Sequence, residues 1–452
     1  MRFPESLLKE LKENFSIDER AFLEAHQHAA PVSVRLNPCK PAYDHEKSSP
    51  VPWCANAYYL PARPIFTSDP LFHAGCYYVQ EASSMFVEHA VKQTVDLNNK
   101  IVALDACAAP GGKSTLLASL LNAQSLLVSN EVISTRVPVL VHNMAKWGAI
   151  NNVVTNNDPK DFSRLPAFFD VIVVDAPCSG SGLFRKQEDA VDHWSEESVH
   201  HCSQRQHRIL HDLLPSLKED GILIYSTCSY SMEEDEKICD ELVSEFGLVP
   251  VELNVPTEWG ITQTKTKGGA VGYRFFPHLL KGEGFFLACF RKMTTNDLPR
   301  ERKRLKRNLG GKLSKDEEKA AGNFLDLADV IFLKENEEII GYKSGVEDEL
   351  LAIASALKIK KWPLHLGQLK GKDFIPHPFS AYLQGVTKEA KREDLNIESA
   401  LLYLRKQNIE FKGEKGLALV TYKGFGLGWA KNLGNRVNNY YPAEWRILKE
   451  DF

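Results

Sequence analysis

The sequence has no apolar run long enough to span a membrane, no Cys-x-x-Cys pair and no large excess of either charge. Its 9 cysteines are odd in number and unpaired in spacing, which favours reduced thiols over a disulfide scaffold. The formal net charge of -4 excludes a protein that coats nucleic acid indiscriminately through overall positive charge. The first residues lead directly into a charged amphipathic pattern, with no apolar core typical of a signal peptide. We therefore expect a cytoplasmic protein that is not bound to a membrane.

The length of 452 residues is too great for one hydrophobic core and predicts several domains. Short apolar runs alternate with helical patterns over the middle of the chain, which predicts an open, mostly parallel α/β sheet. The predicted strands are residues 101–105, 126–131, 153–155, 171–175, 222–225 and 285–290. The predicted parts are an N-terminal region (1–98), an α/β domain (99–292), a basic linker (293–318), an intermediate domain (319–385) and a C-terminal domain (386–452).

Two stretches have a composition suited to nucleic acid. Six of the nine residues 299–307 are cationic, which fits a solvated linker as well as a segment that contacts phosphates. Glycines, amides, aromatic residues and cations are interleaved over residues 423–441. This mixture favours stacking on unpaired bases, although the glycine-rich turns of a small β-barrel would produce much of the same composition.

Two cysteines, Cys178 and Cys228, each follow an apolar run that predicts a buried strand. Two such thiols are what chemistry on a pyrimidine ring requires. A thiolate that adds to carbon 6 of cytosine makes carbon 5 nucleophilic, and a second group must then remove the carbon 5 proton. The spacing does not say which cysteine attacks. Without a cofactor site nearby, both would be better explained as buried structural thiols.

A candidate cofactor loop follows the first predicted strand of the sheet. It comprises Cys107, Ala108, Ala109, Pro110, Gly111, Gly112 and Lys113. The glycine pair lets the backbone approach a ligand closely at the carboxyl edge of the sheet. The loop lacks the earlier glycine of a phosphate-binding loop and the three spaced glycines of a dinucleotide site. It therefore suits a nucleoside-bearing ligand without a phosphate chain.

Acidic residues end the next two predicted strands. Glu131 can accept hydrogen bonds from both hydroxyls of a ribose, and Asp158 can accept one from an adenine amino group. Either residue alone would more often cap a turn or a helix. Together with the loop, the set is satisfied by S-adenosylmethionine.

No metal site is predicted. Five residues resemble a metal cluster, but they fall within one predicted helix and lack a second ligand group at zinc spacing. These are His200, His201, Cys202, His207 and His211.

Five motifs together resemble those of the Nop2/Sun-type RNA cytosine-5 methyltransferases. They are residues 75–84, 107–113, 175–182, 226–229 and 284–286, in the order of that family. The tail is similar to the PUA-like RNA-binding end of the bacterial 16S rRNA methyltransferase F group. The resemblance implies a doubly wound, Rossmann-like class I methyltransferase domain. It also implies a small N-terminal α+β RNA-binding region and a C-terminal PUA-like, β-rich domain.

The resemblance assigns a role to each site residue. Cys228 is implied as the nucleophile at carbon 6 and Cys178 as the group that assists proton removal and product release. Asp175 would hold the cytosine edge and contribute to the cofactor site, and Lys113 would position substrate or developing charge. One departure is Asp235, where the family usually has Asn. The cofactor would be S-adenosylmethionine, held by residues 107–113, Glu131, Asp158 and Asp175.

The expected substrate is RNA in which the target cytosine is unpaired or flipped out. Small-subunit rRNA or the 30S particle is favoured, and the protein is expected to be a monomer. The alternatives are a tRNA substrate, DNA cytosine methylation, and a non-catalytic RNA-binding assembly factor. Arg185 and Lys186 are equally well interpreted as phosphate contacts and as ordinary exposed cations.

Overall fold

The computed structural model describes residues 3–42, 48–187, 189–293, 309–371, 373–386 and 390–448. The whole cationic stretch 299–307 lies outside these residues, as does part of the predicted linker around it. No helix of the described residues is long and apolar enough to cross a membrane.

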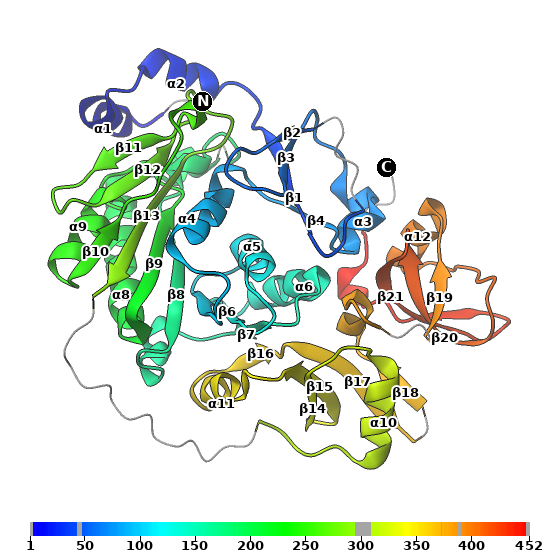
Figure 1. Cartoon of the computed structure of the whole chain (residues 1–452). Coiled ribbons are helices and arrows are strands. Elements are labelled where there is room, and N and C mark those ends of the chain that lie inside the picture. The colour runs from blue at the N-terminus through cyan, green and yellow to red at the C-terminus, as the bar shows by residue number, and fades with distance from the viewer. Residues whose placement is uncertain are drawn as a thin grey trace.

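The centre of the molecule is a ten-stranded sheet (Figure 1). Its strand order is β11-β12-β13-β9-β8-β5-β6-β7-β16, and β10 pairs with β13. Five neighbouring strands are parallel: β5 (Val102–Asp105), β6 (Leu126–Asn130), β7 (Asn152–Thr155), β8 (Phe169–Asp175) and β9 (Leu217–Thr227). The order reverses between β5 and β8, and such a switch point is where doubly wound folds bind ligands. The predicted parallel α/β sheet is therefore confirmed.

Antiparallel strands extend this sheet at both edges. On one side lie β10 (Leu248–Val251), β11 (Thr262–Lys265), β12 (Val271–Phe275) and β13 (Phe285–Lys292). On the other side, β16 (Ile359–Lys361) pairs with β7. The periodicity of the sequence did not predict β10, β11, β12 or β16.

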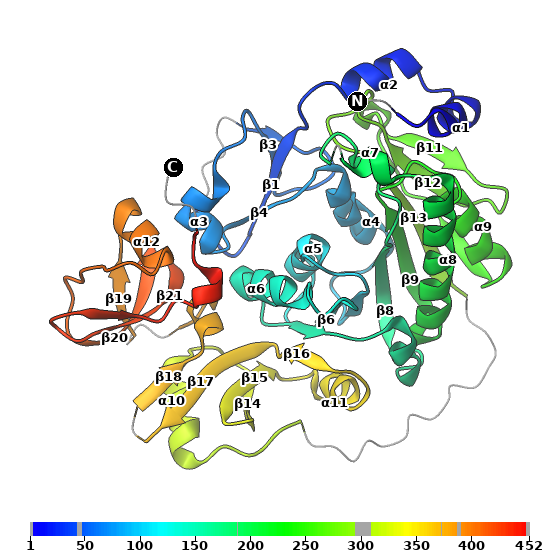
Figure 2. The same cartoon turned by 180° about the vertical axis from the view of Figure 1, so that it is seen from behind.

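Helices cover both faces of the sheet because side chains of successive strand residues point to opposite faces, and both faces are apolar. One face packs against α4 (Val87–Thr94), α5 (Gly112–Leu120) and α6 (Val137–Trp147). The other face packs against α8 (Glu196–Leu213), α9 (Glu236–Ser244) and α11 (Glu347–Ala356). Figure 2 shows α8 running alongside β8 and β9. The short α7 (Asp189–His193) precedes α8.

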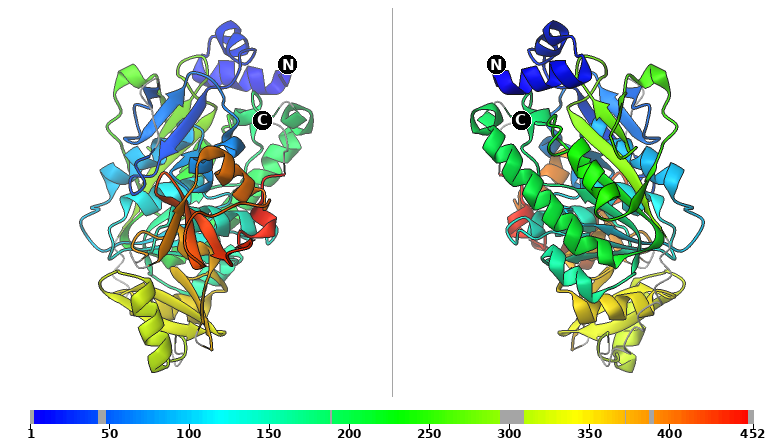
Figure 3. Two further views of the ribbon diagram at one scale, coloured as in Figure 1. Left: turned by 90° about the vertical axis from the view of Figure 1, so that its right-hand side faces the viewer. Right: turned by 90° about the vertical axis from the view of Figure 1, so that its left-hand side faces the viewer.

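The N-terminal part begins with two helices and continues into a sheet of order β2-β3-β1-β4. Its elements are α1 (Glu5–Phe15), α2 (Glu19–Ala25), β1 (Val32–Leu36), β2 (Ser49–Pro50), β3 (Ala57–Leu60), α3 (Pro70–His73) and β4 (Tyr77–Val79). The two helices lie at the end of the molecule opposite to the segment coloured yellow (Figure 3).

Two further four-stranded sheets follow the methyltransferase-like core. The first contains β14 (Val330–Glu335), β15 (Glu338–Lys343), β17 (Leu364–Lys370) and β18 (Asp373–Pro376), with α10 (Lys315–Phe324) beside it. The second contains β19 (Lys391–Asp394), β20 (Gly416–Tyr422), β21 (Phe425–Asn432) and β22 (Val437–Asn439), with α12 (Ile397–Leu404).

The C-terminal sheet packs directly on the N-terminal sheet. One hydrophobic core joins Val34 and Leu71 to Tyr403 and Leu427. The two parts that were predicted to contact RNA therefore lie side by side, although they are at opposite ends of the chain (Figure 1).

Candidate active site

The two predicted thiols meet at the carboxyl ends of neighbouring strands. β8 and β9 are parallel, with Asp175 opposite Ser226. Cys178 follows the end of β8 and Cys228 follows the end of β9, so that their Sγ atoms lie 3.0 Å apart. Both residues are partly buried and neither is in a disulfide. The structure thus joins two residues that are 50 positions apart in sequence.

A buried carboxylate holds the two cysteine loops together. Glu234 accepts hydrogen bonds from the Ser179 hydroxyl at 2.6 Å and the Ser179 N–H at 2.7 Å. It also accepts from the Ser229 hydroxyl at 2.6 Å and from Gln206 Nε2 at 3.3 Å. Each loop therefore contributes a serine to the same acceptor. The sequence analysis did not select Glu234, although a serine next to each cysteine was a visible signal.

A close backbone contact also fixes the loops. The Gly182 N–H donates to the Cys228 carbonyl at 2.9 Å. A Cβ at Gly182 would lie 2.8 Å from that carbonyl oxygen and 2.5 Å from the Gly284 carbonyl oxygen. Only glycine fits here, because these neighbours are backbone atoms that cannot move aside.

The hydrogen bond to Cys228 and burial raise the pKa of Cys178 well above its ordinary value. Either sulfur can be the donor of this bond. A thiol with a raised pKa is a weaker acid, and its thiolate is a stronger base.

An ion pair lies beside the thiols. Lys113 Nζ is 2.7 Å from Asp175 Oδ2, and the Ser226 hydroxyl donates to Asp175 Oδ1 at 3.0 Å. Burial lowers the pKa of Lys113, but its contact with Asp175 and the charges of Asp105 and Cys228 together outweigh burial, and the net shift is upward. Lys113 is therefore cationic. The side chain of Asp175 is 35% exposed, so it remains accessible to a ligand.

The predicted cofactor loop turns sharply between β5 and α5. Gly111 has a φ of 116°, which is strained for residues with a side chain, and it caps the start of α5. Two hydrogen bonds fix the loop. Asn143 Nδ2 donates to the Pro110 carbonyl at 2.8 Å, and the Ala108 N–H donates to the Asn130 carbonyl at 2.8 Å. Burial raises the pKa of Cys107, so this third thiol stays protonated.

The two acidic strand ends both stabilise turns, as the more ordinary interpretation of each predicted. Glu131 Oε1 accepts from the Ile133 N–H at 2.8 Å, and Asp158 Oδ1 caps the turn at Lys160 at 3.2 Å. The other oxygen of Glu131 lies 3.4 Å from an Arg136 guanidinium nitrogen. Each carboxylate keeps further lone pairs that can accept from a ligand. The next side chains after Glu131, Val132 and Ile133, are each 40% exposed and could pack against an adenine ring.

Family models match three parts of the chain. "16S rRNA methyltransferase RsmB/F" matches residues 92–291, "N-terminal domain of 16S rRNA methyltransferase RsmF" matches 3–82, and "Methyltransferase RsmF PUA domain" matches 390–447. Ribosomal RNA small subunit methyltransferase F of Vibrio atlanticus is 31% identical over 449 residues, which cover 95% of this chain and 94% of the relative. The chain belongs to the small-subunit ribosomal RNA methyltransferase F family.

Other relatives agree with this membership. The methyltransferase F of Aliivibrio fischeri is 30% identical, covering 98% of this chain and 97% of its own length. A solved methyltransferase homologue from Pyrococcus horikoshii has a TM-score of 0.53 and 27% identity, and covers 64% of this chain and 100% of its own. The Rossmann-like methyltransferase fold, the N-terminal domain and the C-terminal PUA domain are therefore all confirmed.

All the predicted site residues of this methyltransferase F family member lie in the region matched by the RsmB/F model. Asp235, where the Nop2/Sun-type family usually has Asn, contacts two other side chains. Asp235 is fully buried, accepts from the Thr227 hydroxyl at 2.6 Å and lies 3.0 Å from an Arg274 guanidinium nitrogen. Arg274 also forms hydrogen bonds with Glu236, and burial raises the pKa of Asp235 well above its ordinary value.

Asp105 is a candidate site residue that the sequence analysis did not select. It is fully buried at the end of β5, and its Oδ2 accepts from the Ser114 hydroxyl at 2.6 Å. Its Oδ1 is buried without a hydrogen-bond partner among the described residues. Burial raises the pKa of Asp105 to about 7. A buried, unpartnered acceptor beside the loop fits a cofactor that carries a donor group, such as the ammonium of S-adenosylmethionine.

We expect Asp105→Asn to stabilise the cofactor-free protein at high pH and to weaken cofactor binding. The folded-state pKa lies above that of an exposed carboxyl, so the buried charge destabilises the fold increasingly as the pH rises from about 4 to 7. The gain in unfolding free energy at pH 8 should be roughly 2 to 4 kcal/mol. Thermal unfolding at several pH values, with calorimetric titration of cofactor, measures both effects. A stability difference that does not change with pH would contradict the assignment.

Arg185 is a structural residue and not a phosphate contact. Its guanidinium is 3.0 Å from Glu283 Oε1 and also donates to the Gly282 carbonyl at 2.7 Å. The side chain is only 6% exposed, because it is packed between α2 and the loop before β13. Lys186 is exposed, so a phosphate contact by this residue stays a prediction. The histidine-rich stretch lies on α8, as predicted.

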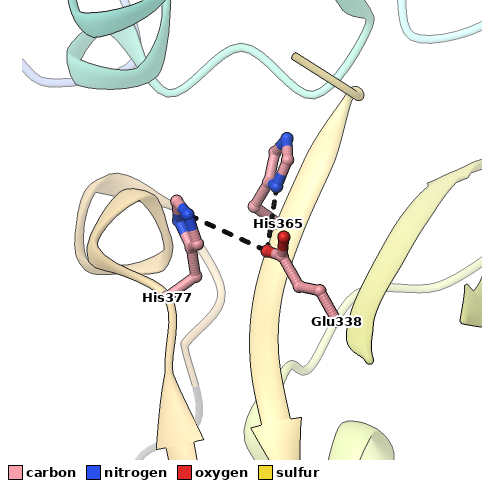
Figure 4. A group of neighbouring side chains, drawn as sticks. All are labelled: Glu338, His365 and His377. Atoms are coloured by element: carbon pink, nitrogen blue, oxygen red, sulfur yellow. Dashed lines mark hydrogen bonds and ion pairs between the residues drawn. The ribbon is translucent and has the colours of Figure 1, made fainter. Parts of the chain in front are cut away.

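A different cluster of possible metal ligands lies between β15, β17 and the turn after β18 (Figure 4). His365 Nδ1 is 2.9 Å from Glu338 Oε1, while its Nε2 accepts from the Trp362 N–H at 3.0 Å. His377 Nδ1 accepts from the Phe379 N–H at 3.1 Å. Each neutral imidazole therefore carries its proton on the nitrogen nearer to Glu338. This arrangement fits a hydrogen-bonded link within the intermediate sheet better than a metal site.

Proposed function

We propose that the protein transfers a methyl group from S-adenosylmethionine to carbon 5 of a cytosine in 16S rRNA. The observation that carries this proposal is the pair of thiols 3.0 Å apart, next to the ion pair of Lys113 and Asp175. Membership of the methyltransferase F family supports the substrate class. Methylation of cytosine at carbon 5 uses a thiolate that adds to carbon 6 and a second group that removes the carbon 5 proton.

In the first step, the Cys228 thiolate adds to carbon 6 of the cytosine and the electron pair moves toward ring nitrogen 3. Asp175, which is partly exposed, is placed to hold that edge of the base. The Lys113 cation beside it stabilises the negative charge that develops on the ring. Carbon 5 is then a nucleophile, and S-adenosylmethionine, when bound, would supply the methyl group and leave as S-adenosylhomocysteine.

In the second step, the proton on carbon 5 is removed and the bond between Cys228 and carbon 6 breaks, which restores the aromatic ring. Cys178 would accept that proton as a thiolate, since its sulfur lies 3.0 Å from that of Cys228. The net change at the base is one hydrogen replaced by one methyl group. Cys228 is regenerated.

The cofactor would be held along the ends of β5, β6, β7 and β8. Residues 107–113 and Asp105 lie at the first of these ends, Glu131 and Asp158 follow the second and third, and Asp175 ends the fourth. Asp105 is our addition to the predicted cofactor-binding residues. We also propose that the boundaries between the parts of the chain lie at residues 98, 292, 318 and 385.

RNA would bind across the N-terminal and PUA domains, which share one hydrophobic core. The cytosine must leave its stack to reach the thiols, so the target should be an unpaired or flipped base. The cytoplasmic location and the monomeric state remain predictions.

Bisulfite sequencing of total RNA, from cells with and without the gene, tests the function. We expect one or more protected cytosines to be lost from small-subunit rRNA and no change in tRNA. Loss from tRNA alone would retain the chemistry and reject the substrate. No loss in either RNA, together with no binding of S-adenosylmethionine in a calorimetric titration, would favour a non-catalytic assembly factor.

A further inference from the structure

The intermediate segment is joined to the methyltransferase sheet at the strand that leads into the predicted adenine site. β16 pairs with β7, with Ile359 opposite Thr155 and Lys361 opposite Val154. β7 runs directly into Asn156, Asn157 and Asp158. A strand from residues 319–385 thus borders one of the loops that would hold the cofactor.

The main chain of Lys358, just before β16, is bound by two asparagines of that loop. The Asn156 N–H donates to the Lys358 carbonyl at 3.1 Å. The Lys358 N–H donates to Asn157 Oδ1 at 2.8 Å, across 201 residues of sequence. Asn157 is 8% exposed, so this bond is protected from competition by water.

Asn156 extends the link to the second cofactor loop. Its side-chain Nδ2 donates to the Glu131 carbonyl at 2.7 Å and to the Val132 carbonyl at 3.1 Å. Glu131, the predicted ribose-binding residue, and the loop before Asp158, the predicted adenine-binding residue, are therefore both linked to the main chain of Lys358.

A third hydrogen bond and a cleft also lie between the intermediate segment and the central sheet. Arg164 donates to the Ala356 carbonyl, at the end of α11, at 3.1 Å. An open cleft of about 620 Å³ is lined by Asp158 on one side and by Leu357 and Trp362 on the other. The cofactor loops are not free at this edge, because the intermediate segment forms part of their support.

We propose that Asn156 and Asn157 are positioning residues, through which the Lys358 peptide of the intermediate segment sets the affinity for S-adenosylmethionine. This inference rests on the proposed function, since it requires the cofactor site. Neither asparagine is assigned a reaction step. They hold Glu131 and Asp158 in the geometry that receives the ribose and the adenine, which reduces the cost of ordering both loops on binding.

The test compares Lys358→Pro with Lys358→Ala in the full-length protein. Proline lacks the N–H that Asn157 accepts, whereas alanine retains it. Leu357 already has φ -122° and ψ 161°, which is the conformation that a residue before proline prefers. The side chain of Lys358 is exposed, so its loss in both variants should have little effect.

We expect the proline variant to raise the Kd and the KM for S-adenosylmethionine by about fivefold or more, the effect of one buried hydrogen bond. The kcat at saturating cofactor and the KM for RNA should stay within about twofold of the wild type. The alanine variant should retain the wild-type Kd. A purely structural role would instead lower the Tm without this separation of KM from kcat.

A second pair of variants covers the case in which the proline variant does not fold. Asn156→Ala removes the bonds to the Glu131 and Val132 carbonyls. Asn122→Ala removes similar bonds, to the Leu97 carbonyl at 3.1 Å and the Asn99 carbonyl at 2.7 Å, away from the site. Only the first should weaken cofactor binding. Equal Kd values for both members of each pair would overturn the inference, whereas a wild-type protein that does not bind cofactor would overturn the proposed function.

Discussion

Cys228→Ala is expected to abolish methylation, with a fall in turnover of at least about 10³-fold. The alanine has no nucleophile to add to carbon 6, so carbon 5 of the cytosine is never activated. Cys107 does not replace it, because burial raises the pKa of that thiol, and Cys178 is assigned to the later step. The measurement is incorporation of a labelled methyl group into small-subunit RNA from a strain that lacks the gene.

A second thiol variant controls for general effects of cysteine loss. Cys39 is exposed and far from the pair in sequence, so Cys39→Ala should retain wild-type turnover. Cofactor binding should be unchanged in Cys228→Ala, since residue 228 is not part of the proposed cofactor site. Substantial turnover by Cys228→Ala would reject the assigned nucleophile.

Cys178→Ala is expected to accumulate a covalent complex between protein and RNA. Cys228 can still add to the base and the methyl group can still be transferred, but removal of the carbon 5 proton and release of the product are slow. Loss of a positioned proton-transfer group typically costs about 10² to 10⁴-fold in rate. The complex should survive denaturing electrophoresis, contain labelled RNA and disappear after nuclease treatment.

The double variant Cys178→Ala/Cys228→Ala identifies the sulfur that forms the bond. It should form no complex, because the nucleophile is absent. A complex in Cys228→Ala but not in Cys178→Ala would reverse the two roles. That result would correspond to the chemistry of DNA cytosine methylation, in which the cysteine of the Pro-Cys loop attacks.

Much of the central fold could be predicted from local patterns. The apolar runs of the parallel strands are continuous because both faces of the sheet are covered by helices, so they are distinct from the surrounding sequence. The antiparallel strands β10 to β12 were missed. They are short, and β11 alternates partly buried with exposed residues, a weaker signal than an unbroken apolar run.

Part of the candidate site could also be predicted from local patterns. Cys178, Cys228, Lys113 and Asp175 stand in short contiguous motifs, and the structure brings all four together. Glu234 and Asp105 were missed because their importance comes from burial and from partners elsewhere in the chain. Arg185 could not be distinguished from an exposed cation, since its partner Glu283 is 98 residues away.

By itself the sequence determined the kind of sheet and supplied candidates for the reactive residues and the cofactor. Those properties depend on residue type and on short-range spacing, which a strand, a turn or a motif expresses within a few positions. Only the tertiary structure decided that the two thiols are in contact, which acids are buried and which distant segment borders the candidate cofactor loops. Those properties depend on contacts between residues that are far apart in the chain, such as Lys358 and Asn157, and no local pattern specifies such pairs.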